Sequence, residues 1–338
     1  MTEPAAPRTG QGRRPSPALL WANLAVIYVV WGSTYFGIAV AIESIPPFLM
    51  ATIRFAVAGV VLIAFDLWRH PEARHWPTRR QLVDSAIVGA LLLGIGNGFV
   101  ALGETTVPSG IAAILIAMTP LWFALLGWLF LRQRLPRLVV GAIGLGFIGT
   151  AVLVWPAGEG ATAFDPGGIL VLLLADLGWA IGSIYSASRA RLPASPLTAS
   201  GLQTLSGGAF TFVEAVVVGE PARFMPSAVS MQSILAVAYL VLFGSILAYT
   251  AYGWLLRNAP LSLVSTHAYV NPIVAVALGT LILHEPISAR TIVAAAIILA
   301  AVAIIVAARG RLGTSTAEAP KEVDAPDPGR GGRSEATA

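Results

Sequence analysis

The sequence predicts an all-α integral membrane protein with ten transmembrane helices, arranged as two inverted repeats of five helices. Three observations lead to this fold class. The chain is 56% hydrophobic and 11% charged, with a mean hydropathy of +0.78. Its apolar runs are about 20 residues long, which is the length that spans a bilayer as a helix. A set of spaced residues in the first half also recurs in the second half.

The apolar runs are bounded by charged residues, glycine or proline, and each predicts one membrane-spanning helix. The first run is longer than the core of a signal peptide and has no cleavage site, so we expect it to be retained. Both ends, 1–17 and 309–338, lack periodicity and are predicted to be disordered tails. The predicted spans are 18–42, 47–67, 82–103, 108–131, 136–155, 167–188, 196–219, 231–257, 260–283 and 289–308.

The basic residues predict the orientation of these spans. If the N-terminus is cytoplasmic, only Arg223 and Arg290 fall on the outer side and Arg54 falls inside a span. Cytoplasmic connectors are enriched in Lys and Arg, so this asymmetry places both termini in the cytoplasm and requires an even number of spans. The other 18 of the 21 basic residues lie on the cytoplasmic side: Arg8, Arg13, Arg14, Arg69, Arg74, Arg79, Arg80, Arg132, Arg134, Arg137, Arg189, Arg191, Arg257, Arg309, Arg311, Lys321, Arg330 and Arg333.

The internal repeat appears as matching spacings in the same order. Copies lie 148, 149 and 152 residues apart, and five helices per copy make the second copy enter the membrane from the opposite face. Such inverted repeats are typical of alternating-access transporters. The matching sets are Trp31-Gly32-Ser33 with Trp179 to Ser183, then Pro47, Arg54 and Gly59 with Pro196, Gln203 and Gly208, then Pro108 and Pro120 with Pro260 and Pro272.

The segments WGSTYFGIAVAIESIPPFLMATIRFAVAG, ETTVPSGIAAILIAMTPLWFALLGWLFLRQRLP and LSLVSTHAYVNPIVAVALGTLILHEPIS resemble the EamA-type exporters of the drug/metabolite transporter superfamily. The resemblance covers residues 18–308, with one repeat over 18–155 and the other over 167–308. It implies a ten-helix exporter of small metabolites, amino acids or drugs in the cell membrane, which works by alternating access. The motifs identify the fold much better than the substrate.

Two charged residues are predicted near the middle of the membrane. Arg54 lies about 10 Å and Asp176 about 13 Å from the outer side, at 1.5 Å per residue. Intramembrane charges usually face the bundle interior, so Arg54 predicts substrate contact, with a helix-locking arginine bonded to backbone carbonyls as the equal alternative. The two either form a pair, or Asp176 is a protonatable coupling site that desolvation pushes toward neutrality. Glu104, near a helix end, is expected to be solvated.

Pro120 and Pro272 predict breaks in two spans, because each removes a backbone N–H and frees a carbonyl, at Ile116 and Ala268. Broken backbone at membrane depth often lines a wet cavity. Packing kinks and ordinary interhelical hydrogen bonds are the alternative for these prolines and for the polar residues around them. The candidate substrate-binding residues are Trp31, Tyr35, Arg54, Asn97, Thr119, Trp179, Ser183, Gln203, Tyr249, Tyr252, His267 and Asn271.

The spans 136–155 and 289–308 are almost wholly apolar and carry small residues at close-packing intervals, so they predict a scaffold or a homodimer interface. The lipid bilayer and a small-molecule substrate are the other expected partners, and nucleic acid is not expected. The chain has no cysteine, no metal-ligand cluster and no Walker motif, so we expect no enzyme activity, metal or cofactor. A passive channel or facilitator for small polar solutes is the alternative function.

Overall fold

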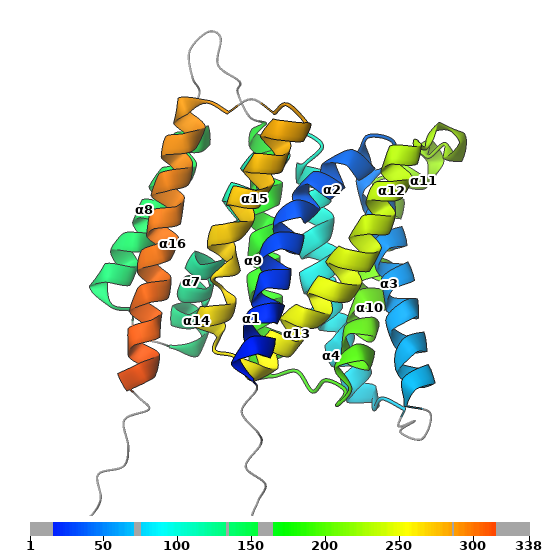
Figure 1. Cartoon of the computed structure of the whole chain (residues 1–338), viewed down its shortest axis with the longest axis horizontal. Coiled ribbons are helices and arrows are strands. Elements are labelled where there is room, and N and C mark those ends of the chain that lie inside the picture. The colour runs from blue at the N-terminus through cyan, green and yellow to red at the C-terminus, as the bar shows by residue number, and fades with distance from the viewer. Residues whose placement is uncertain (1–15, 71–75, 133–134, 155–164, 286, 316–338) are drawn as a thin grey trace, which may run out of the picture.

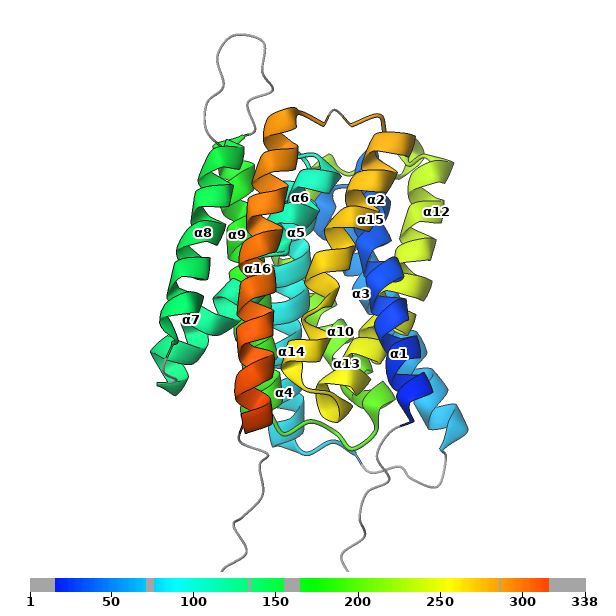
Figure 2. The ribbon, with the colours of Figure 1, turned by 60° about the vertical axis from the view of Figure 1, so that its left-hand side comes forward.

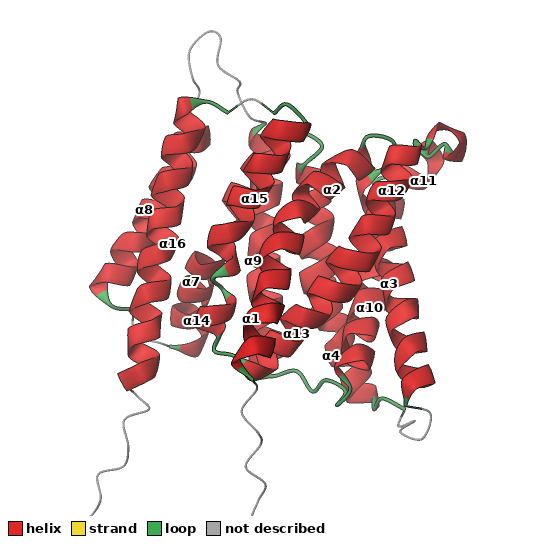
Figure 3. Ribbon diagram, in the orientation of Figure 1, coloured by secondary structure: helices red, strands yellow, loops and turns green. Residues whose placement is uncertain are grey.

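The structure is a computed structural model that describes residues 16–70, 76–132, 135–154, 165–285 and 287–315. The regular elements of the described residues are all helical, and most of the helices run along one common direction, as Figures 1, 2 and 3 show. Seven helical segments among them are long and apolar enough to cross a membrane. The predicted spans 136–155 and 260–283 correspond to shorter apolar helices. The span 196–219 corresponds to a helix with several buried Ser, Thr and Gln side chains.

The first half of the chain, in order, forms α1 (Pro17–Val26), η1 (Ile27–Trp31), α2 (Gly32–Ile42), α3 (Pro47–Arg69), α4 (Arg79–Gly89), η3 (Ala90–Gly98), α5 (Phe99–Gly103), α6 (Ser109–Ile116), α7 (Thr119–Leu131) and α8 (Arg137–Val154).

The second half forms α9 (Pro166–Ser188), α10 (Pro196–Val217), α11 (Glu220–Arg223), η4 (Pro226–Ala228), α12 (Met231–Tyr239), η5 (Leu240–Ala248), α13 (Tyr249–Asn258), α14 (Leu261–Val264), α15 (His267–Ile282) and α16 (Ala289–Ser315). Helix α16 continues past the predicted end at residue 308, because the first proline after that point is Pro320. Of the predicted tails, 1–17 and 309–338, residues 1–15 and 316–338 lie outside the described residues.

Several helices begin at a Ser, Thr or Asp whose side chain accepts a free backbone N–H, and in α1, α9 and α10 a proline holds the first helical position. Asp165 accepts the N–H groups of Gly167 (3.2 Å) and Gly168 (2.9 Å) at the start of α9. These two bonds hold the pKa of the Asp165 carboxyl below its usual range, because they stabilise its charged form. Thr78 and Gln81 form a capping box at the start of α4.

Helices α3 and α10, the second helix of each half, pack together in opposite directions. Near the end of α3, Asp66 accepts a hydrogen bond from Thr198 in the first turn of α10. Beyond the end of α10, Glu220 accepts the backbone N–H groups of Phe48 (3.2 Å) and Leu49 (2.8 Å) in the first turn of α3. Each helix therefore has its start held by a carboxylate from the far end of the other.

The same two helices approach closely through glycine. A Cβ added to Gly59 would lie 2.6 Å from Cγ of Leu205 and 2.9 Å from the carbonyl oxygen of Gly201. Only a residue without a side chain leaves room for backbones at this distance, as in the small-residue contacts of membrane helices.

Helices α8 and α16 stand side by side at one edge of the bundle (Figures 1 and 2). A Cβ on Gly149 of α8 would lie 2.8 Å from Ile298 of α16, so the small-residue face of α8 is occupied within the chain. The expected homodimer through these two helices is therefore not supported. On α16, Ala294 and Ala301 are buried, whereas Ala296, Ala300, Ala303 and Ala307 are exposed.

Helical geometry changes in the middle of several segments. The π-helical segments η3 and η5 begin 150 residues apart, at Ala90 and Leu240, so the internal repeat is also present in the backbone. The break before Pro120 falls at Ala117–Met118, between α6 and α7, as predicted. The prediction for Pro272 was wrong in position: Pro272 lies inside continuous α15, and the interruption falls earlier, at residues 265–266.

The two ends of the bundle differ in charge. Helix α1 begins and α16 ends at the same end (Figure 1). The ends of α3 and α13 lie there too, with the start of α4 and the connector from α9 to α10, and this end carries Arg69, Arg79, Arg80, Arg189, Arg191 and Arg257. We call it the basic end, and the other the opposite end.

Candidate functional site

A cavity of about 70 Å³ lies in the interior of the bundle. It is large enough for several water molecules, since one needs about 10–15 Å³ on the same measure. Helical segments of both halves contribute to its wall, which brings together nine of the predicted site residues: Trp31, Tyr35, Asn97, Thr119, Asp176, Trp179, His267, Asn271 and Pro272. We call it the central cavity.

Asp176 is the only residue with a formal charge among those that line the central cavity. It lies on α9, is fully buried, and one carboxyl oxygen is hydrogen-bonded to the hydroxyl of Thr119. The other oxygen makes no hydrogen bond of good geometry, with the indole of Trp122 beside it. A buried carboxyl group in this position has little to stabilise a negative charge.

The Thr119 hydroxyl has one hydrogen and two acceptors within reach. It lies 2.7 Å from the carbonyl oxygen of Ile116, which the break between α6 and α7 leaves free, and also contacts the carboxyl group of Asp176. Both contacts become hydrogen bonds at once if Asp176 is protonated, because its O–H then donates to Thr119 while Thr119 donates to Ile116.

Four aromatic rings form a cluster at one side of the central cavity: Trp31, Trp179, Tyr252 and His267, which we call the aromatic cluster. The centroid of the Trp31 ring lies 5.4 Å from Trp179, 4.8 Å from Tyr252 and 5.4 Å from His267. Edge-to-face and tilted rings at such distances attract one another. The predicted residue Ser183 fixes Tyr252 through a 3.1 Å hydrogen bond between their hydroxyls.

His267 is oriented by Asn271, one turn further along α15. With the Asn271 amide oxygen accepting from Nδ1 of His267 (3.2 Å), the amide nitrogen donates to the carbonyls of Tyr28 (3.1 Å) and Ile27 (3.3 Å). These carbonyls belong to the π-helical segment η1, whose altered bonding makes them accessible to a side chain. Asn271 thus joins the second half of the chain to the first beside the cavity.

A larger cavity of about 460 Å³ lies on the other side of the aromatic cluster, toward the basic end. Three predicted residues, Gln203, Tyr249 and Tyr252, line it, together with Arg257 and the connector between α9 and α10. The Tyr249 hydroxyl donates to Oε1 of Gln203 at 2.6 Å. Tyr252 belongs both to this wall and to the aromatic cluster, so the cluster separates the two cavities.

Arg54 lines a third, small space next to the central cavity and shares Trp31, Asn97 and Trp179 with it. Its side chain is 4% exposed, and its Nε–H donates to the hydroxyl of Ser245 in η5 at 2.7 Å. It makes no ion pair with Asp176 and no hydrogen bond to a backbone carbonyl among the described residues, so neither the pairing nor the carbonyl-bonded alternative is found.

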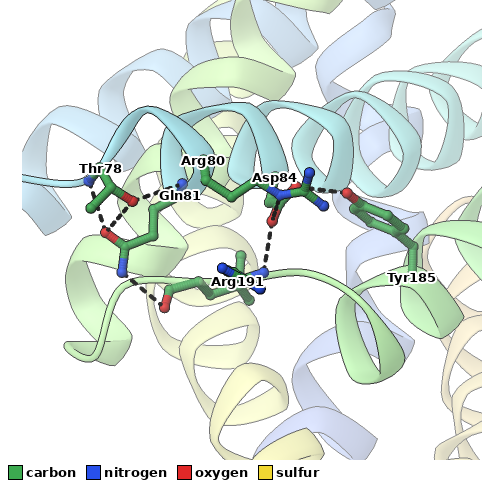
Figure 4. Close-up of polar contacts among 7 residues, drawn as sticks. Thr78, Arg80, Gln81, Asp84, Tyr185 and Arg191 are labelled. Atoms are coloured by element: carbon green, nitrogen blue, oxygen red, sulfur yellow. Dashed lines mark hydrogen bonds and ion pairs between the residues drawn. The ribbon is translucent and has the colours of Figure 1, made fainter.

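A polar network holds the connector between α9 and α10 at the rim of the larger cavity (Figure 4). Asp84 of α4 accepts hydrogen bonds from the Arg80 side chain (2.9 Å), the Tyr185 hydroxyl (2.7 Å) and the backbone N–H of Arg191 (2.8 Å). The Gln81 amide reaches the same connector. Sequence reasoning missed this network, because Asp84 is only the sixth residue of α4, where a carboxylate is usually solvated.

Sequence reasoning also missed Glu104, which is not solvated as expected. Its side chain is 9% exposed, and both carboxyl oxygens are buried without a hydrogen bond. The signal was present: Glu104 follows the cavity residues Asn97 and Val100 at intervals of seven and four, which places all three on one face of a helix. Glu104 was nevertheless expected to be solvated, because it lies directly after the last residue of the helix.

The model of the EamA-like transporter family matches the chain twice, over residues 16–155 and 166–307. Similar proteins include the uncharacterized inner membrane transporter YedA of Escherichia coli K12, 38% identical over 288 residues, which are 85% of this chain and 90% of YedA. Protein PecM of Dickeya dadantii is 28% identical over 279 residues, 82% of this chain and 88% of PecM. A solved crystal structure with 20% identity matches with a TM-score of 0.61, over 88% of this chain and 99% of that chain, and supports the fold.

Proposed function

We propose, from the premise that this chain belongs to the EamA-like transporter family, that it is a secondary transporter that exports small organic molecules by alternating access. The observation that carries the proposal is the central cavity, which has walls from both halves of the chain and is separated from a larger cavity by the aromatic cluster. Alternating access needs such a site, with a barrier that can open on one side at a time.

The proposed membrane arrangement has ten spans in two inverted repeats, 18–155 and 167–308, with both termini in the cytoplasm. Three features support it. Helices α3 and α10 pack in opposite directions, the π-helical segments η3 and η5 begin 150 residues apart, and the arginines gather at the end where α1 begins and α16 ends. In this arrangement the basic end faces the cytoplasm, and the larger cavity is the entry for cytoplasmic substrate.

The chemistry of the central cavity's lining supports amino acids or small drug-like compounds with an apolar or aromatic part as substrates, for which the cavity of about 70 Å³ would have to widen. Two tryptophans and a tyrosine provide apolar contact surface, and the side chains of Asn97, Asn271 and Thr119 provide hydrogen-bonding groups. A passive channel is the weaker candidate, because the rings of the aromatic cluster contact one another across the path between the two cavities.

We propose Asp176 as the proton-coupling group. A coupling carboxyl must gain and lose a proton during the transport cycle, and Asp176 is buried, has no cationic partner among the described residues, and lines the central cavity. Thr119 is arranged so that both its contacts are satisfied when Asp176 carries the proton.

The test begins with cells that overproduce the protein, challenged with toxic amino acids, their analogues and cationic drugs. Compounds against which it protects are then measured for flux in liposomes that contain the purified full chain, with and without a pH gradient. We expect saturable flux that the gradient accelerates, and loss of that acceleration in Asp176→Asn. The matched control is Asp165→Asn, an exposed carboxylate at the start of the same helix.

Flux that rises linearly with concentration and never saturates would indicate a channel instead of a transporter. Full proton-driven flux in Asp176→Asn would exclude Asp176 as the coupling site, and would leave the transporter assignment in place.

A further inference from the structure

The buried carboxyl group of Glu104 has no role in the site described so far. It follows α5 at the opposite end of the bundle, and each of its oxygens is out of contact with solvent and without a hydrogen bond to the described residues. A charged carboxylate in such surroundings costs several kcal/mol of desolvation, so a packing role alone would favour an apolar residue.

The ionisable groups around Glu104 come from several elements. Arg54 on α3 and Glu285 on the connector before α16 interact with it electrostatically. Glu285 is itself held by the backbone N–H groups of Ser109 (2.8 Å) and Gly110 (3.1 Å) at the start of α6. One basic and one acidic side chain, from two different elements, thus act on Glu104.

Tyr35 of α2 connects Glu104 with the central cavity. Its ring lines that cavity, and its electrostatic neighbours are the two buried carboxyl groups, Glu104 and Asp176. Its hydroxyl makes no hydrogen bond to the part of the chain that the structure describes, so it is free to accept one proton while it donates its own. Val100, one turn before Glu104, lines the same cavity, so Glu104 lies just beyond the end of the cavity that faces away from the basic end.

From this arrangement we infer that Glu104 and Tyr35 form the proton path between the opposite end of the bundle and Asp176. The inference rests on the proposed coupling role of Asp176. When the opposite end opens, a proton reaches the carboxylate of Glu104, which is closed to solvent in this structure, and passes to the phenol oxygen of Tyr35, directly or through water in the central cavity. Tyr35 releases its own proton to the carboxylate of Asp176, so Glu104 and Tyr35 each gain one proton and give one up, and Asp176 gains one.

Arg54 is a positioning residue in this path. Its charge attracts the ionised form of Glu104 after the proton has left, while Glu285 repels it. Because these two electrostatic effects oppose each other, both the protonated and the ionised form of Glu104 stay accessible, as a proton relay requires.

The test follows the protons directly and needs no substrate. Infrared difference spectra of the full chain in lipid bilayers report the C=O bands of protonated carboxyl groups, which shift when H is exchanged for D. We expect one band that Glu104→Gln removes and another that Asp176→Asn removes. In Glu104→Gln and in Tyr35→Phe, the Asp176 band should exchange more slowly, by about 10²-fold, the lower end of what a positioned proton donor contributes.

The matched control is Glu43→Gln, an exposed carboxylate in a connector at the same end, which should leave both bands and both rates unchanged. Circular dichroism checks that each variant keeps its helical content, and Tyr35→Phe provides the test if Glu104→Gln does not fold. An unchanged rate at Asp176 in the folded variants would overturn the path. Absence of an Asp176 band would overturn the coupling proposal as well, whereas failed transport with intact bands would concern the proposed function alone.

Discussion

Replacing Glu220 with alanine should loosen the start of α3 by an amount that follows from the hydrogen bonds there. Helix α3 begins at Pro47, directly after the capping residue Pro46, and neither proline has an N–H; the N–H of Met50 already bonds to the carbonyl of Pro46 at 2.8 Å. The remaining free donors, Phe48 and Leu49, both donate to Glu220, which is 4% exposed. A buried donor left without its acceptor costs about 1–3 kcal/mol, so Glu220→Ala, which leaves two donors without one, should lower the free energy of unfolding by about 2–6 kcal/mol.

The assay is unfolding of the purified protein in mixed micelles, followed by tryptophan fluorescence over a denaturant series. Glu220→Gln keeps one carbonyl acceptor and should lose about half as much as the alanine variant. Glu285→Ala removes a similar pair of bonds from the start of α6 but from a more exposed side chain, and should fall below Glu220→Ala. A change in Glu220→Ala of less than about 0.5 kcal/mol, as surface substitutions give, would refute this account of the helix start.

Two further predictions concern packing and pH. Gly59→Ala should destabilise the protein by about 1–3 kcal/mol, because its Cβ would meet Leu205 at 2.6 Å, whereas Gly141→Ala, whose Cβ meets nothing within 4 Å, should stabilise α8 by about 0.5–1 kcal/mol. The unfolding assay described above measures both variants, and equal changes in the free energy of unfolding for Gly59→Ala and Gly141→Ala would contradict this prediction. Because the pKa of Asp165 is lowered in the folded state, its capping is present above the unfolded-state pKa and is lost as pH falls through the folded value. Hydrogen exchange, corrected for intrinsic rates, should show the first turn of α9 losing protection on acidification in the wild type but not in Asp165→Asn, which caps in one charge state; equal losses would contradict it.

Much of the helical arrangement could be predicted, because hydropathy and proline placement act locally. The break before Pro120 follows from a missing N–H and a steric clash within one turn. Pro272 behaves differently: α15 continues through it, and the interruption lies at residues 265–266, beside the bonds between Asn271 and η1. Such a contact joins residues more than 200 positions apart, which no local pattern reveals. The same limit applies to the π-helical segments.

The candidate site was predictable where polar or aromatic residues occur at helical spacing in apolar runs. This brought Trp31, Asp176 and His267 to one cavity. The pattern could not separate the central cavity from the larger one, because Gln203 and Tyr249 have the same periodicity at a different depth. Glu104 was missed because burial at a helix end depends on which neighbours cover it.

The paired carboxylates of α3 and α10 restrict how this protein can move. Sliding the two helices past each other by one turn, about 5.4 Å, would break the contact of Asp66 with Thr198 and that of Glu220 with Phe48 and Leu49 in the same step. Helices α3 and α10 are therefore held to each other by hydrogen bonds at both ends of their contact. On the proposed alternating access, we expect α3 and α10 to stay fixed to each other while other helices move around them, so this pair is a suitable reference frame for describing motion in the chain.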